Sequence, residues 1–176
     1  MAIDSSLPGG NHVGVDTGYP LAIRLDGRMR FLLWVSGDGE DSVVAEGGLA
    51  LAFDNLGALS QHAAETAMRV EGDPRDPVDL DAAERWCSAA SRPDPVLLLE
   101  TWNLCWDVSN GTGAPFEHRS DELTVLYDKL FDANNLPSMR PPGERWEPEW
   151  SQDEVPQLQR LISTGVSMIR ASLDPA

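Results

Sequence analysis

The chain is nearly devoid of lysine. Lys129 is the single lysine among thirteen basic residues, and twenty-nine aspartates and glutamates give the 176 residues a formal net charge of −16 at pH 7. Such an excess repels polyanions, which disfavours nucleic acid and anionic membranes as ligands and favours a partner with a basic surface. Alternatively, abundant Ala, Gly, Asp and Arg with almost no Lys is typical of a GC-rich genome, and acidity then serves solubility alone.

Long apolar runs are also missing. No run approaches the roughly 18 residues that a membrane-spanning helix requires. Residues 1–6 have neither the basic nor the apolar part of an export signal, so we expect a cytoplasmic protein without membrane contact. Hydrophobic residues nevertheless make up 41% of the chain and include six tryptophans, which predicts a folded core rather than disorder.

Cysteine is scarce, with only Cys87 and Cys105. Each adjoins a tryptophan in an apolar helical context, which predicts buried free thiols rather than a disulfide. The cysteines lack C-x-x-C spacing and the three histidines are far apart, so the sequence predicts no metal site and no cofactor. An alternative is a small hydrolase-like enzyme that uses carboxylates, or Cys105 with His118 and a carboxylate such as Asp107.

Short apolar runs predict strands in the first third of the chain, over 21–25, 31–35 and 43–53. Asp26-Gly27 between the first two is typical of a hairpin turn, and Gly47-Gly48 interrupts the third as a bulge or a break into two strands. Apolar residues three and four apart then predict helices. Their expected first residues or caps are Asp54, Asp79, Asp94 (with a helix to about residue 108), Ser120 and Ser151.

Strands followed by helices predict an α+β fold. We expect a three- to four-stranded antiparallel meander with about five α-helices packed over one face. Residues 1–18, rich in Gly and Ser, are expected to be a loosely ordered lead-in, and residues 19–176 a single α+β domain.

Two segments are candidate partner-binding surfaces. The first is a charged linker, with Glu71, Asp73, Asp76, Asp79 and Asp81 as its acidic residues. The second is a proline-fixed segment rich in interface-forming residues, comprising Arg140, Arg145, Trp146, Glu147, Glu149 and Trp150. The tryptophans of the second segment can also serve simply to cover the helices.

Part of the C-terminal half resembles small bacterial proteins of toxin-immunity loci. The residues that carry the resemblance are 126–131 (LYDKLF), 134–137 (NNLP), 142–144 (PGE) and 149–151 (EWS). It implies a cytoplasmic single-domain inhibitor of a basic toxin, and no catalytic residues come with it. The expected function is therefore a non-enzymatic acidic binding protein, with a hydrolase-like enzyme or a helper protein of no separable activity as alternatives.

Overall fold

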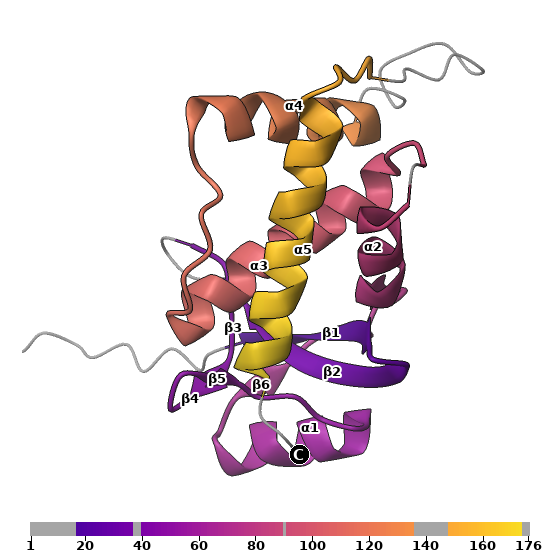
Figure 1. Ribbon diagram of the computed structural model, residues 1–176. Helices are drawn as coiled ribbons and strands as arrows, with labels where there is room; N and C mark the ends of the chain where they lie inside the picture. The colour runs from indigo at the N-terminus through magenta and orange to yellow at the C-terminus, as the bar shows by residue number, and fades with distance from the viewer. Residues whose placement is uncertain (1–16, 37–39, 90, 136–147, 174–176) are drawn as a thin grey trace, which may run out of the picture.

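The protein is described by a computed structural model over residues 17–36, 40–89, 91–135 and 148–173 (Figure 1). Strands β1 (Thr17–Leu25) and β2 (Arg28–Val35) form an antiparallel hairpin. Asp26 and Gly27 both have positive φ, 53° and 71°, as the tight turn of a hairpin requires. The predicted hairpin is confirmed, but β1 begins at Thr17, two residues inside the predicted lead-in.

The third apolar run breaks into short strands, as Gly47-Gly48 allowed. Strand β3 (Ser42–Val43) pairs with β2, whereas β4 (Ala45–Glu46) and β5 (Leu49–Ala50) form a separate two-stranded sheet. The turn between β4 and β5 holds both glycines at positive φ, 59° and 85°. The third strand of the expected meander is therefore only two residues long.

The charged linker contains two strands that the sequence did not predict. Strands β6 (Arg69–Val70) and β7 (Val78–Asp79) both pair with β1 in parallel, β6 near its start and β7 near its end. The sheet order is β3-β2-β1-β6, with β7 also on β1. The meander is antiparallel, and these additions make the sheet mixed.

The described residues form five helices, α1 before β6 and the other four after β7, which confirms an α+β fold. Their bounds are α1 Leu56–Glu65, α2 Leu80–Cys87, α3 Pro95–Thr112, α4 Asp121–Asn135 and α5 Glu154–Ser172.

Most of the predicted caps are confirmed. The carboxylates of Asp79 and Asp94 accept hydrogen bonds from the first amides of α2 and α3. Ser151 and Glu154 form the predicted reciprocal bonds of a capping box, but α5 begins only at Glu154, with Asp153 as its N-cap. The cap of α1 is Asn55 and not Asp54, whose carboxylate lies 3.1 Å from the Arg30 guanidinium.

The sheet is covered on both faces, not on one as expected. Leu32 and Leu33 are adjacent in β2 and therefore point to opposite faces, yet both are fully buried. Leu32 belongs to the main core beneath α2, α3 and α5, and Leu33 packs with Leu59 and Ala63 of α1. In Figure 1, α1 lies on the side of the sheet away from α3 and α5.

Helices α3 and α5 cross closely over the main core. A Cβ atom at Gly165 of α5 would collide with the Cys105 sulfur of α3. At the end of α5, Arg170 donates hydrogen bonds to Asp26 in the hairpin turn and to Glu84 in α2. This arginine therefore ties α5 to both the sheet and α2. No helix in the described part of the chain is long and apolar enough to cross a membrane.

Candidate functional site

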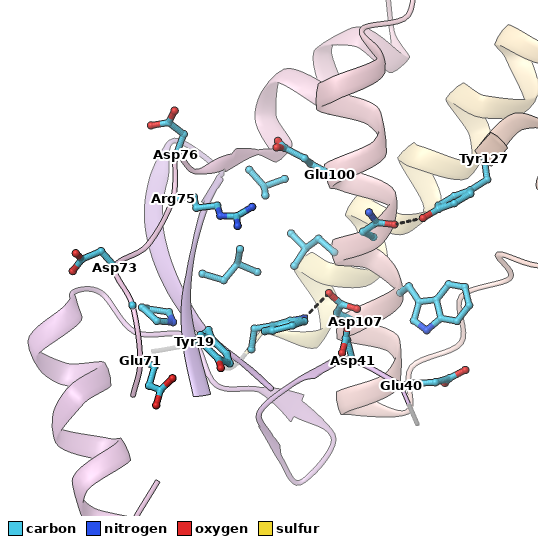
Figure 2. Close-up of a pocket in the computed structure, with 18 of the residues that line it drawn as sticks. Tyr19, Glu40, Asp41, Glu71, Asp73, Arg75, Asp76, Glu100, Asp107 and Tyr127 are labelled. Atoms are coloured by element: carbon cyan, nitrogen blue, oxygen red, sulfur yellow. Dashed lines mark hydrogen bonds between the residues drawn. The ribbon is translucent and has the colours of Figure 1, made fainter. Parts of the chain in front are cut away.

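A cavity of about 970 Å³ lies between the β1–β2 hairpin, α3 and the segment 71–78 (Figure 2). Its origin is a mismatch in chain length. Residues 19–22 of β1 separate the two parallel pairings, whereas residues 71–77 separate β6 from β7. The longer segment cannot follow β1 and bows away from it. Pro74 and Pro77, which have no amide hydrogen, prevent a continuous ladder there.

The cavity wall is strongly acidic and partly aromatic. Its carboxylates belong to Glu40, Asp41, Glu71, Asp73, Asp76, Glu100 and Asp107. Its cations are Arg75 and Arg119, and its aromatic rings are Tyr19, Trp34, Trp106 and Tyr127. Carboxylates therefore outnumber guanidinium groups by seven to two around one concave surface.

Helix α3 supplies one wall through a polar stripe. Glu100, Asn103 and Asp107 are spaced three and four residues apart and lie on one face, turned toward the cavity. The neighbouring residues Trp102 and Cys105 are buried in the core on the other face. In Figure 2, Glu71, Asp73 and Asp76 lie on the opposite side, from the bowed segment.

Asp107 is the most perturbed carboxyl group of the wall. Burial, reinforced by the nearby charge of Asp41, raises its pKa to about 6. A hydrogen bond from the Trp34 indole, with Nε1 3.0 Å from Oδ2, acts in the opposite direction and orients the carboxylate. The ionised carboxylate of Asp107 is therefore partly desolvated, and the Trp34 hydrogen bond does not fully offset this cost.

The pKa values of Glu100 and Tyr127 are also raised. Burial raises the pKa of Glu100, with a further contribution from Asp94, while the Arg75 charge opposes the rise. Burial also raises the pKa of Tyr127, whose hydroxyl donates to Asn103 at 3.1 Å. A cation in this cavity would stabilise the ionised carboxylates of Glu100 and Asp107.

Arg119 lies at the edge of the cavity near Glu40 and Trp106. Its Nη2 atom is 3.2 Å from Glu40 Oε1, and its Cζ atom is 4.0 Å from the centroid of the Trp106 ring. The same indole contacts His118, with ring centroids 3.6 Å apart. His118 Nδ1 lies 2.9 Å from the Phe116 carbonyl, an acceptor, so Nδ1 carries the hydrogen. A guanidinium group is thus already held between a carboxylate and an indole.

Three residues of the predicted acidic surface line the cavity: Glu71, Asp73 and Asp76. The other two have intramolecular roles. Asp79 caps α2, and Asp81 accepts hydrogen bonds from the turn amides of Asp26 and Gly27 at 2.7 and 2.9 Å. The charged linker thus divides into a part at the rim of the cavity and a part that anchors α2 and the hairpin.

The predicted proline-rich surface is described only at its end. Arg140, Arg145, Trp146 and Glu147 lie outside the described residues. Glu149 is exposed, and its carbonyl accepts a hydrogen bond from Lys129. Trp150 packs against the main core, with the Lys129 ammonium 5.7 Å from the ring centroid. Neither residue lines the cavity.

Both cysteines are free thiols, as expected, but only Cys105 is buried, whereas Cys87 is partly exposed. Cys105 is fully buried, and burial raises the pKa of its thiol. Its sulfur packs where α3 meets Gly165 of α5. Because a nucleophile must reach the thiolate form and the substrate, this environment does not favour catalysis by Cys105. Among the described residues, no group of three or more His, Cys, Asp or Glu side chains is arranged to hold a metal ion.

The sequence also held a signal that the prediction missed. Along the otherwise apolar middle of α3, the polar residues Glu100, Asn103 and Asp107 follow a helical repeat. This pattern marks a second, solvated face on a helix that is otherwise buried. No sequence pattern predicted that the tyrosines and tryptophans of the cavity would gather there, because they come from chain segments that are far apart in sequence.

Comparisons with known proteins identify no family. No protein-family profile matches the chain, and no curated protein matches it. One solved structure, the crystal structure of the SatS C-terminal domain in complex with bromine, is similar with a TM-score of 0.47 and 12% sequence identity. The match covers 89% of this chain and 92% of that one. A likeness at this level carries no conclusion about fold family or function.

Proposed function

We propose that this chain is a non-enzymatic binding protein whose cavity receives positively charged groups of a basic protein partner. The observation that carries the proposal is the wall described above, in which seven carboxylates and four aromatic rings surround one concavity. Carboxylates attract a cation over a distance, and aromatic faces hold it at contact.

The electrostatics of the wall support a cation as ligand. A concave, low-dielectric wall of one sign focuses the field and concentrates oppositely charged groups. Asp107, with a pKa of about 6, gains compensation for its ionised form when a cation binds. Binding therefore strengthens as the pH rises through about 6, because the ligand prefers the ionised carboxylate.

The size of the cavity supports a protein side chain or short segment rather than a bare ion. Cavities of about 300–1,000 Å³ accommodate ligands with many non-hydrogen atoms, and this one measures about 970 Å³. A basic toxin domain is a more specific version of the same proposal. It rests on the sequence resemblance alone.

The test is calorimetric titration of the protein with a capped octapeptide of alternating arginine and glycine. The cavity variant is Glu100→Gln with Asp107→Asn, in which the asparagine still accepts the Trp34 hydrogen bond. The matched control, Glu46→Gln with Asp132→Asn, removes the same charge at two exposed residues that do not line the cavity.

We expect the cavity variant to bind the peptide about tenfold more weakly, since close charge pairs couple by about 1.5 kcal/mol or more. The control variant should remain within about twofold of the wild type, because exposed charges contribute little. An equal loss in both variants would mean that the peptide responds only to net charge and would contradict the proposal.

A further inference from the structure

We infer that the cavity selects a guanidinium over an ammonium group, and that Arg119 occupies part of the place into which a partner's arginine side chain fits. The inference rests on the proposed function and adds the chemistry of the ligand. It starts from Arg119, one of the two arginines that line the cavity.

Arg119 shows how the wall holds a guanidinium. The group lies over the Trp106 ring, 4.0 Å from Cζ to the centroid, while Nη2 is 3.2 Å from Glu40. Its side chain nevertheless remains 66% exposed, so the contact is at the mouth of the cavity and is open to exchange. An exposed pair of this kind contributes little to stability, and a ligand can displace it at small cost.

A second combination of aromatic rings and a carboxylate lines the cavity at Tyr19, Trp34 and Asp107. Trp34 and Tyr19 present rings whose centroids are 5.6 Å apart and whose planes are tilted by 58°. The Trp34 indole holds Asp107 through the hydrogen bond drawn in Figure 2. An ionised carboxylate offers about four lone-pair sites, so this one bond leaves acceptor capacity.

The pairing of an aromatic ring with a carboxylate, at Trp106 and Glu40 and at Trp34 and Asp107, favours a guanidinium group as ligand. A guanidinium is planar, stacks on an aromatic face and still directs its N–H donors sideways to carboxylates. An ammonium is a compact, strongly hydrated charge that must lose water to enter a wall of rings and a half-buried carboxylate. The arrangement around Trp106, Arg119 and Glu40 therefore shows how a guanidinium would bind at Trp34 and Asp107.

The test compares two capped octapeptides of equal charge, one alternating arginine and glycine, the other lysine and glycine. Each is titrated into the wild type, Arg119→Gln and Arg160→Gln. Arg160 is exposed on α5 and does not line the cavity, so its variant removes the same charge elsewhere. Arg119→Lys, which keeps the charge but not the planar group, is the second variant at this position.

We expect the wild type to bind the arginine peptide at least fivefold more tightly than the lysine peptide. Arg119→Gln should tighten binding of the arginine peptide by a further threefold or more, whereas the lysine peptide changes only as much as in Arg160→Gln. Arg119→Lys should shift in the same direction as Arg119→Gln, because the indole face is no longer occupied by a guanidinium.

Two results separate the failure of this inference from that of the proposed function. Equal affinities for the two peptides, or equal tightening of both by Arg119→Gln, would overturn guanidinium selection. If the Glu100→Gln, Asp107→Asn variant still binds the peptides more weakly, the proposed function stands. Binding of both peptides that ignores that cavity variant overturns the proposed function and this inference together. A far-ultraviolet circular dichroism spectrum of each variant verifies that the fold is retained.

Discussion

The Trp34 indole donates a hydrogen bond to Asp107 across the cavity, joining β2 to α3 with 3.0 Å between Nε1 and Oδ2. The bond stabilises the ionised carboxylate, while burial and Asp41 destabilise it more, and the resulting pKa is about 6. The two residues are seventy-three positions apart in sequence. This polar contact therefore links two walls of the cavity and acts on the charge of one of them.

Asp107→Asn should flatten the pH dependence of stability. Because the pKa of Asp107 is about 6 when folded and near 3.8 when unfolded, the native state binds more protons between these values, and wild-type stability falls as the pH rises through them. Asparagine cannot ionise and avoids this loss. Relative to the wild type, the variant should gain about 1–2 kcal/mol in the free energy of unfolding between pH 4 and pH 7, allowing for partial exposure.

Urea unfolding at several pH values measures this difference. Asp132→Asn, at an exposed position on α4, is the control and should follow the wild-type profile. A constant offset between Asp107→Asn and the wild type across the pH range would show that Asp107 does not titrate within it.

The local signals of the sequence predicted the elements well. Asp26-Gly27 supplied the positive φ values of the hairpin turn, and Asp79 and Asp94 supplied caps, because each depends on a few adjacent residues. The helix expected to end near residue 108 continues to Thr112 and ends at Gly113, whose φ is 75°. Gly111 lies inside that helix at a position where a Cβ would collide with the Val43 carbonyl, so the close approach requires glycine.

The non-local features could not be predicted in the same way. Strands β6 and β7 are two residues long each and carry no alternation, so only their pairing with β1 defines them. The acidic character of the linker indicated half of the cavity through Glu71, Asp73 and Asp76. The other half arises where α3 and the hairpin meet the bowed segment, which no local pattern encodes.

Gly165→Ala should destabilise the protein through the contact between α5 and α3. The new Cβ would meet the Cys105 sulfur, and overpacking of this kind typically costs about 1–3 kcal/mol. Adding Cys105→Ala removes the sulfur and should restore part of the loss, so the double-mutant cycle gives a favourable coupling free energy. Thr164→Ala, at an exposed neighbouring position, is the control. Additive losses would contradict the close approach of the two helices.

The thiols should be unreactive in the native protein. Cys105 is fully buried, and burial raises the pKa of Cys87 to about 11, so both remain protonated at neutral pH. Since the thiolate is the reactive form, labelling by a thiol-exchange reagent at pH 8 should be slow and should become fast only in denaturant. Rapid native labelling of Cys105, seen by comparison with Cys87→Ser, would reopen the possibility of a nucleophilic role.

The acidic residues of the bowed segment and those of α3 should affect binding in different ways. Asp73 and Asp76 point outward at the rim (Figure 2), where charges act at a distance and are screened by salt. Asp73→Asn with Asp76→Asn should therefore slow association with the arginine peptide several-fold at low salt, and the effect should vanish above about 0.5 M salt, where the Debye length falls to a few ångströms. Asp107→Asn should instead accelerate dissociation and retain that effect in salt, because the proposed function puts this partly desolvated carboxylate in contact with the bound cation. Stopped-flow measurement of tryptophan fluorescence separates the two rate constants, with Glu46→Gln and Asp132→Asn as the charge-matched control. The same salt dependence in the Asp73→Asn, Asp76→Asn variant and in Asp107→Asn would contradict the different roles of the bowed segment and α3.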